Sequence, residues 1–264
     1  MSGHARSCCM LIGLAALPAI ASADDAHGRC AGLPDYATLK TALVAAVQTE
    51  TSGLDFQMWG TIVDRDGVVC AVAFSGIDRG SQWPGSRAIS AQKANTANAF
   101  SLDALALSTA NLYSATQPGG SLYGLQHSNP VDTSVAYGGS PSSYGTAHDP
   151  MVGQRIGGVN VFGGGLGLYN ASNRIIGAVG VSGDTSCTDH MIAWRVRANL
   201  GLDHLGSVGG PASIFTGDKT HPDNIIFDIA ANPTGGTGIS ATGFGHPTCL
   251  NNTTDPKSLP PVRP

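Results

Sequence analysis

The sequence has few charged and few aromatic residues. Charged side chains make up 12% of the 264 residues and aromatic side chains 6%, whereas glycine occurs 36 times. So little charge argues against a charged helical bundle and favours sheets joined by ordered loops. With 42% hydrophobic residues, wholesale disorder is also excluded. The 14 basic and 18 acidic residues give a formal net charge of −4, which offers nothing to nucleic acid or to an anionic membrane surface.

Long hydrophobic runs are equally scarce. The one clear run, residues 8–20, follows Arg6 and precedes the small residues 21–23, which together are typical of a cleaved secretory signal. The run is too short to cross about 30 Å of hydrocarbon as a helix. We therefore predict a signal peptide over residues 1–23. The processed protein should be periplasmic or secreted, without a membrane attachment.

Four cysteines follow the predicted signal: Cys30, Cys70, Cys187 and Cys249. Export favours disulfides, and four cysteines allow three pairings. Short loops cost less entropy to close, which favours Cys30 with Cys70 and Cys187 with Cys249 without deciding between the pairings. Cys187 and His190 also form a CxxH pair that could bind zinc, although the second half of a tetrahedral site is not visible.

Several cofactor and catalytic motifs are missing. In the glycine-rich segment "GGVNVFGGGLGLYNASNRIIGAVGVSG", Asn170 stands where a dinucleotide fingerprint needs its third glycine, and no Walker lysine follows. A C-x-x-C-H sequence is absent, which excludes covalent haem attachment. There is also no G-x-S-x-G nucleophile motif. We interpret the segment as a β-hairpin, with the glycines at 163–165, 177 and 180 allowing close packing.

Apolar periodicity predicts a helix and a hairpin in the first part of the chain. Leu39, Leu43 and Val47 recur at helical spacing after Asp35. The β-type runs 56–63 and 68–74 then flank an Asp-Gly pair, which is typical of a tight hairpin turn. The breaker-free, alanine-rich segment that follows, up to residue 116, predicts one broken helix or two consecutive helices.

The second part of the chain predicts the glycine-rich hairpin and a last helix. Ser186 and Asp189 resemble a capping box at the start of that helix, and Gly201 would end it. Both hairpins are antiparallel, so we expect an α+β fold, a single domain with an antiparallel β-sheet flanked by helices.

The expected domain is interrupted and followed by irregular segments. We assign residues 24–206 to the domain and expect a long loop over residues 117–156, a length that is usually functional or disordered. Residues 207–264 are rich in Gly, Pro and Asn, with one β-like run at 224–229. We expect them to form an irregular tail that wraps over the core and is fixed through Cys249.

Three segments resemble the GlcG/HbpS haem-binding family: "GTIVDRDGVVCAVAFSG", "SRAISAQKANTANAF" and "GGVNVFGGGLGLYNASNRIIGAVGVSGDTSCTDHMIA". The resemblance covers about residues 36–206 and leaves the tail and the 117–156 loop without a counterpart. It implies an antiparallel sheet with helices packed on it, homo-oligomers and, for several members, non-covalent haem. The functions implied for exported members are haem capture, iron handling or redox sensing.

The haem expectation directs attention to residues that can bind a flat ligand or its iron. His127, close to Tyr123, is the first-choice axial ligand because histidine is the commonest haem donor. His190 and His148 are alternatives, Lys93 lies in a segment that matches the family, and Trp83 and Trp59 could stack on a porphyrin. The ordinary interpretation of each is a hydrogen-bonded histidine, a surface lysine or a core tryptophan.

Three functions follow from the sequence. The first is an exported protein that binds haem or another small flat ligand. The second is a periplasmic enzyme acting on a small oxygenated molecule, with Asp189, His190 and Lys93 as acid and base groups. The third is a ligand-free structural or assembly protein.

Overall fold

The computed structural model describes residues 29–236 and 238–264. The predicted signal peptide lies outside the described residues. Among those that are described, no helix combines the length and hydropathy that a membrane crossing requires.

The centre of the molecule is a four-stranded antiparallel sheet with the strand order β2-β1-β4-β3. The predicted hairpins form its two halves and meet where β1 pairs with β4. The strands are β1 (Trp59–Asp64), β2 (Val69–Phe74), β3 (Gly165–Tyr169) and β4 (Ile175–Ser182). In the first turn, the Asp64 carboxylate accepts hydrogen bonds from the amides of Asp66 and Val68. Gly67 supplies the positive φ of 76° that the turn requires.

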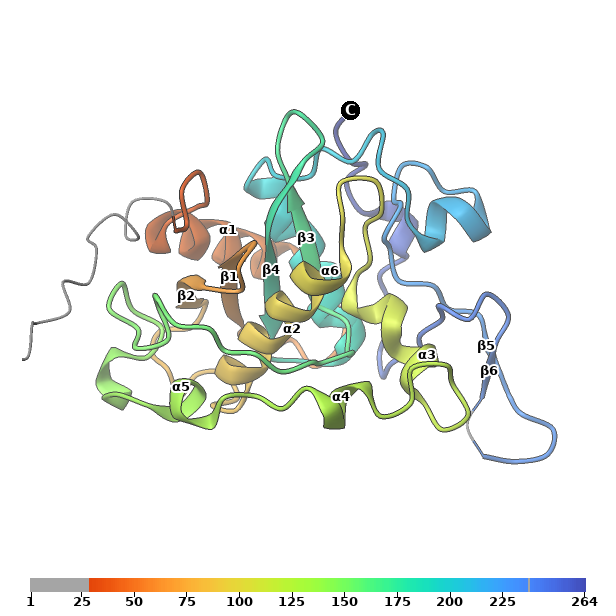
Figure 1. The fold of residues 1–264 in the computed structure, drawn as a ribbon, viewed down its shortest axis with the longest axis horizontal. Coiled ribbons are helices and arrows are strands. Elements are labelled where there is room, and N and C mark those ends of the chain that lie inside the picture. The colour runs from red at the N-terminus through yellow and green to blue at the C-terminus, as the bar shows by residue number, and fades with distance from the viewer. Residues whose placement is uncertain (1–28, 237) are drawn as a thin grey trace, which may run out of the picture.

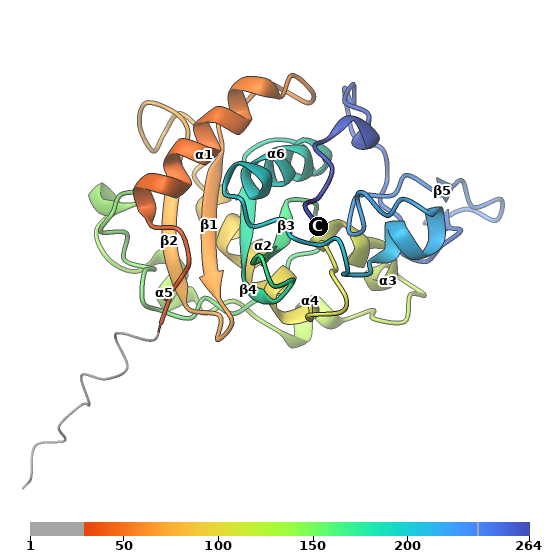
Figure 2. The same ribbon diagram turned by 90° about the horizontal axis from the view of Figure 1, so that it is seen from above.

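Helices cover both faces of this sheet (Figures 1 and 2). Helices α1 (Tyr36–Thr49) and α6 (Ser186–Asn199) lie side by side on one face, and α2 (Ser86–Phe100) crosses the other. Alternate residues of β4 serve the two faces: Val179 packs with α1 and α6, whereas Ala178 packs with α2. The predicted α+β class is thus confirmed.

Glycines let α2 lie directly on the strands. A Cβ added to Gly180 would come 2.0 Å from the Ser90 carbonyl oxygen, and one added to Gly165 would come 2.4 Å from that of Lys93. These distances leave no room for any side chain. Close packing of helix on sheet therefore accounts for these glycines.

The remaining elements are short. Region 86–116 holds α2, a 3₁₀ turn and a short helix, so the expectation of a broken helix is met. The prediction of a β-like run at 224–229 is wrong for most of its length, because only its last residue, Ile229, lies in a strand. The short elements are the 3₁₀ turn Thr109–Leu112, α3 (Tyr113–Thr116), α4 (Leu125–Ser128), α5 (Thr133–Tyr137), the 3₁₀ turn Pro141–Ser143, the π-helical turn Ala212–Thr216, β5 (Ile229–Ala230), β6 (Ile239–Ser240) and the 3₁₀ turn Pro256–Ser258.

The start of α6 differs from the predicted capping box. Thr185 is the N-cap, and its side chain accepts from the Thr188 amide. Ser186 and Asp189 instead bond to other parts of the chain: Ser186 contacts Gly163 and His246, and Asp189 binds Lys93. Thr185 and Ser186 are both residue types that cap helices well, so the sequence alone did not distinguish between them as the N-cap.

Two disulfides connect distant segments and match the favoured pairing: Cys30 with Cys70, and Cys187 with Cys249. The second joins α6 to the C-terminal tail, and two tail residues, Ile225 and Leu259, are buried in the same cluster as α1 and α6. The CxxH zinc hypothesis is wrong for this state, because the Cys187 sulfur is bonded to Cys249.

Candidate functional site

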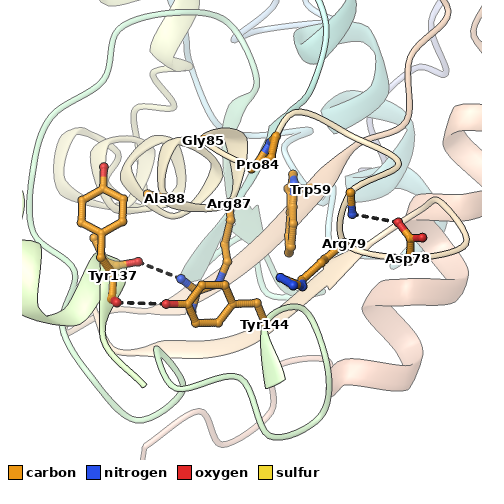
Figure 3. Close-up of a pocket in the computed structure, with 11 residues that line it drawn as sticks. Trp59, Asp78, Arg79, Pro84, Gly85, Arg87, Ala88, Tyr137 and Tyr144 are labelled. Atoms are coloured by element: carbon orange, nitrogen blue, oxygen red, sulfur yellow. Dashed lines mark hydrogen bonds between the residues drawn. The ribbon is translucent and has the colours of Figure 1, made fainter. Parts of the chain in front are cut away.

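A pocket of about 700 Å³ lies between the N-terminus of α2, the loop after β2 and the segment around α5 (Figure 3). Much of its lining is apolar or aromatic: Trp59, Pro84, Ala88, Ala136, Tyr137 and Tyr144. The charged side chains are Asp78, Arg79 and Arg87. This volume falls within the range of roughly 300–1,000 Å³ typical of small-molecule sites, as does the combination of apolar walls with a few polar groups.

Trp59 is a rigid wall of the pocket. It is the first residue of β1, and its ring packs edge-on against Phe74 with 5.4 Å between centroids. The indole N–H donates to the Trp83 carbonyl oxygen over 3.1 Å. With these two contacts the indole cannot rotate freely, and because Trp59 is only 2% exposed, it stiffens the pocket wall from within rather than offering an open face.

Arg87 fixes the opposite wall. Its guanidinium donates to both carboxylate oxygens of Asp149, at 2.5 and 2.9 Å, and to the Ala136 carbonyl oxygen at 2.7 Å. It also stacks over the Tyr144 ring at 3.7 Å. Arg87 and Asp149 are both buried, and a bidentate pair of this kind has a defined geometry. Through these contacts Arg87 holds Ala136, Tyr144 and Asp149, all from the predicted 117–156 loop, in place at the pocket.

Two groups in the pocket are left for a ligand. Arg79 is exposed and has no hydrogen-bond or ion-pair partner within residues 29–236 and 238–264. The Tyr137 side chain is 65% exposed, and its hydroxyl makes no hydrogen bond to the described part of the chain. Tyr144 is different, because its hydroxyl donates to the carbonyls of Tyr137 and Gly138. The pocket thus offers one free cation and one free phenol.

These residues fit a non-covalent haem. A porphyrin needs apolar walls, which the aromatic and apolar residues of the lining supply, and cations for its carboxylates, which Arg79 can supply. Its iron needs an axial donor, and a tyrosine oxygen can serve as well as a histidine. None of the pocket residues is a histidine, so Tyr137 is the donor that the pocket itself provides.

His127, the first-choice ligand from the sequence, and three further candidates lie outside this pocket, whereas Trp59 lines it. His127 is exposed on α4, and Tyr123, just before that helix, is 64% exposed. His148 is exposed in the loop beside Asp149. Trp83 is 48% exposed and stacks edge-on against Phe56, and its carbonyl contributes by anchoring Trp59.

Lys93 and Asp189 are brought together in the protein interior. The Lys93 ammonium donates to Asp189 at 2.6 Å and to the Val181 carbonyl oxygen at 3.1 Å. The other Asp189 oxygen accepts from the amides of Gly183 and Asp184. Burial raises the pKa of Asp189 to about 6 and lowers the pKa of Lys93. Both side chains are buried, at 1% and 3% exposed, so the pair connects α2, β4 and α6 rather than facing a substrate.

His190 is separate from that pair. Its Nε2 lies 3.1 Å from the Asn224 Oδ1 and 3.2 Å from the Ile225 amide nitrogen, and the ring is completely buried. Its Nδ1 has no partner in the described structure. Desolvation lowers the pKa of His190 to about 4, so the ring is neutral at physiological pH. The tail residues around Asn224 cover the ring and keep it from any pocket ligand.

The buried His190 makes stability depend on pH. Since its pKa falls from an ordinary value of about 6.5 to about 4 on folding, only the unfolded chain takes up this proton between those values. The free energy of unfolding should therefore drop by about 3 kcal/mol from this group as pH falls from 6.5 to 4. Burial also lowers the pKa of His246 to about 4, which adds to this loss of stability at low pH. The raised pKa of Asp189 has the opposite effect, because the folded protein then binds that proton more readily than the unfolded chain.

Urea unfolding at several pH values measures this dependence. We expect His190→Gln to reduce the loss of stability between pH 6.5 and 4, and we expect His148→Gln, a change at an exposed histidine, to leave it as in the wild type. Equal pH dependence in His190→Gln and the wild type would show that His190 is not the titrating group.

Four residues of the pocket were not predicted from the sequence: Arg79, Arg87, Tyr137 and Tyr144. Arg87 and Asp149 are 62 positions apart, and no local pattern links two such residues. The one available signal was the 117–156 loop itself, whose tyrosines could have been weighed as donors beside its histidines.

Comparison with known proteins identifies the family. A family model described as "Haem degrading protein HbpS-like" matches residues 35–197. A search of curated proteins gives no significant match. Similar solved structures include protein ORFY of Klebsiella pneumoniae, of the family model DUF336, with 26% identity over 63% of this chain and 90% of that chain and a TM-score of 0.42.

Two further solved structures are similar to this chain. PduOC in complex with heme is 24% identical over 62% of this chain and 89% of that chain, with a TM-score of 0.43. A double mutant of Streptomyces reticuli HbpS is 13% identical over 62% and 82%, with a TM-score of 0.37. The resemblance seen in the sequence is confirmed by the family match, which covers more than half of the chain: this protein belongs to the HbpS-like family of haem degrading proteins.

Proposed function

We propose that this protein binds one haem non-covalently in the Trp59 pocket. The observation that carries the proposal is the combination in one pocket of apolar and aromatic walls, a free arginine and a free phenol. Membership of a haem-related family supports it. The Tyr137 oxygen would hold the iron and Arg79 a carboxylate of the porphyrin edge, while the Arg87–Asp149 pair keeps the wall in position.

We also propose that the protein acts outside the cytoplasm, in haem capture, iron handling or redox sensing. The signal-like residues 1–23 and the two disulfides support export. Homo-oligomers, which the family resemblance implies, are supported by the exposed Phe56–Trp83 pair, because exposed aromatic side chains are enriched at interfaces.

Hemin titration followed by absorption tests the haem proposal. We expect a Soret shift that saturates at one hemin per chain. Tyr137→Phe keeps the ring and removes the donor oxygen, so the band of its complex should differ from that of the wild type. Arg79→Ala should weaken binding by about 10- to 100-fold, as expected for the loss of a charged hydrogen bond worth roughly 1.5–3 kcal/mol.

Tyr123→Phe is the matched control, because Tyr123 belongs to the same loop and is equally exposed but lies outside the pocket. Its titration should match the wild type. A wild-type protein that produces no Soret shift would refute haem binding. If the band is unchanged in Tyr137→Phe and lost in His127→Ala, haem binding stands and the axial ligand is His127.

A further inference from the structure

Ser186 and His246 form a hydrogen-bonded pair, and neither is among the residues that line the Trp59 pocket. Ser186 is the first residue of α6, and its Oγ lies 2.8 Å from Nε2 of His246 in the C-terminal tail. Ser186 is partly exposed, whereas His246 is only 2% exposed. A nucleophile open to solvent beside a shielded base is the arrangement that covalent catalysis requires.

The other ring nitrogen determines which atom donates. His246 Nδ1 lies 2.7 Å from the Pro247 carbonyl oxygen. A carbonyl oxygen can only accept, so the proton is on Nδ1 and Nε2 keeps its lone pair. The Ser186 hydroxyl must therefore donate to Nε2, which is the direction in which a base removes the serine proton. The Pro247 carbonyl thus orients the imidazole, as the third residue of a catalytic triad does.

A backbone amide positions the serine oxygen. The Gly163 amide donates to Ser186 Oγ over 2.7 Å. The Ser186 amide, in the first turn of α6, has no acceptor in the described structure, as is usual at a helix start. Gly163 can approach this closely only because it lacks a side chain, since a Cβ there would be 2.4 Å from the Ser186 carbonyl oxygen. The Gly163 amide therefore positions Oγ itself, and the Ser186 amide is the donor left for a negative oxygen that develops beside Oγ.

The protein fixes the pair from both sides. The Cys187–Cys249 disulfide joins the residue after Ser186 to the tail three residues beyond His246. The Tyr113 ring packs against the imidazole at 4.9 Å between centroids. The two partners, 60 positions apart in sequence, are thus held by a covalent link and an aromatic contact.

We propose that Ser186 and His246 form a nucleophile–base dyad that hydrolyses small acyl esters. The Ser186 Oγ forms a bond to the ester carbonyl carbon while its proton passes to His246 Nε2. The carbon–oxygen bond to the alcohol breaks, and the alcohol leaves with that proton. Water then repeats the sequence on the acyl-serine, with His246 as base, and releases the carboxylic acid and free Ser186.

Acylation by p-nitrophenyl acetate tests this proposal. We expect nitrophenolate release by the full chain with its disulfides intact, and peptide mass mapping should place one acetyl group on Ser186. Ser186→Ala should abolish that label. His246→Gln should slow nitrophenolate release by about 100-fold or more, the usual contribution of a general base.

Ser114→Ala is the matched control, because the Ser114 hydroxyl donates to the Gly245 carbonyl oxygen and so also holds the tail beside His246. It should keep the wild-type rate within about twofold. Mapping of the wild-type protein decides the matter independently of how well any variant folds. A label found only on lysines would overturn the proposal, as would a wild-type protein that releases no nitrophenolate, or equal rates in the wild type and a folded His246→Gln.

Discussion

Gly180→Val is expected to lower the free energy of unfolding by about 3 kcal/mol or more, the upper end of the cost of overpacking. Even a single Cβ at this position would lie 2.0 Å from the Ser90 carbonyl oxygen and 2.5 Å from the Ala94 amide nitrogen. Both atoms belong to the backbone of α2, so no side chain can rotate away to relieve the clash. The helix would have to move off the sheet.

Urea unfolding of the variant against the wild type measures this loss. Gly85→Ala is the control, because a Cβ there meets nothing within 4 Å and the backbone is already helical, with φ −64°. Its free energy of unfolding should stay within about 0.5 kcal/mol of the wild type. If Gly180→Val proved as stable as Gly85→Ala, the direct packing of α2 on β4 would be wrong.

The fold was largely predictable because its signals are local. Asp35 caps α1 through the Thr38 amide, and Asp66-Gly67 marks the first turn; in both cases the decisive contacts lie within a few residues. The start of α6 shows the limit of this reasoning, since Thr185 and Ser186 are both good caps and only one can be used. Distant contacts decided that choice, because Ser186 is bonded to Gly163 and His246.

The candidate pocket was much less predictable. Trp59 and Tyr137 come from segments nearly 80 positions apart, and the loop between residues 117 and 156 has no hydrophobic period that would fix its path. Its position depends on the buried Arg87–Asp149 pair, for which the sequence carries no signal. The sequence placed its first-choice haem ligand, His127, in this loop, and the structure leaves that residue exposed on α4 and outside the pocket.

Lys93→Met is expected to lower the free energy of unfolding by about 3–5 kcal/mol at pH 7, the usual cost of breaking a buried ion pair from one side. The side chains of Lys93 and Asp189 are 1% and 3% exposed, with 2.6 Å between nitrogen and oxygen. Without the ammonium, the Asp189 carboxylate stays buried with only the Gly183 and Asp184 amides to stabilise its charge. Lys219→Met, at an exposed lysine, should change stability by less than about 0.5 kcal/mol.

The pH dependence of the Lys93→Met defect separates lost charge pairing from lost packing. Burial already raises the pKa of Asp189 to about 6, and removing the lysine raises it further. The carboxylate then takes up a proton in the folded state at a pH where the unfolded chain does not, so the defect should shrink as pH falls from 7 to 5. Adding Asp189→Asn to Lys93→Met should recover part of the stability at pH 7, because the amide oxygen can still accept from Gly183. A defect that is the same at pH 7 and pH 5, and that Asp189→Asn does not relieve, would mean that Lys93 acts through its packing alone.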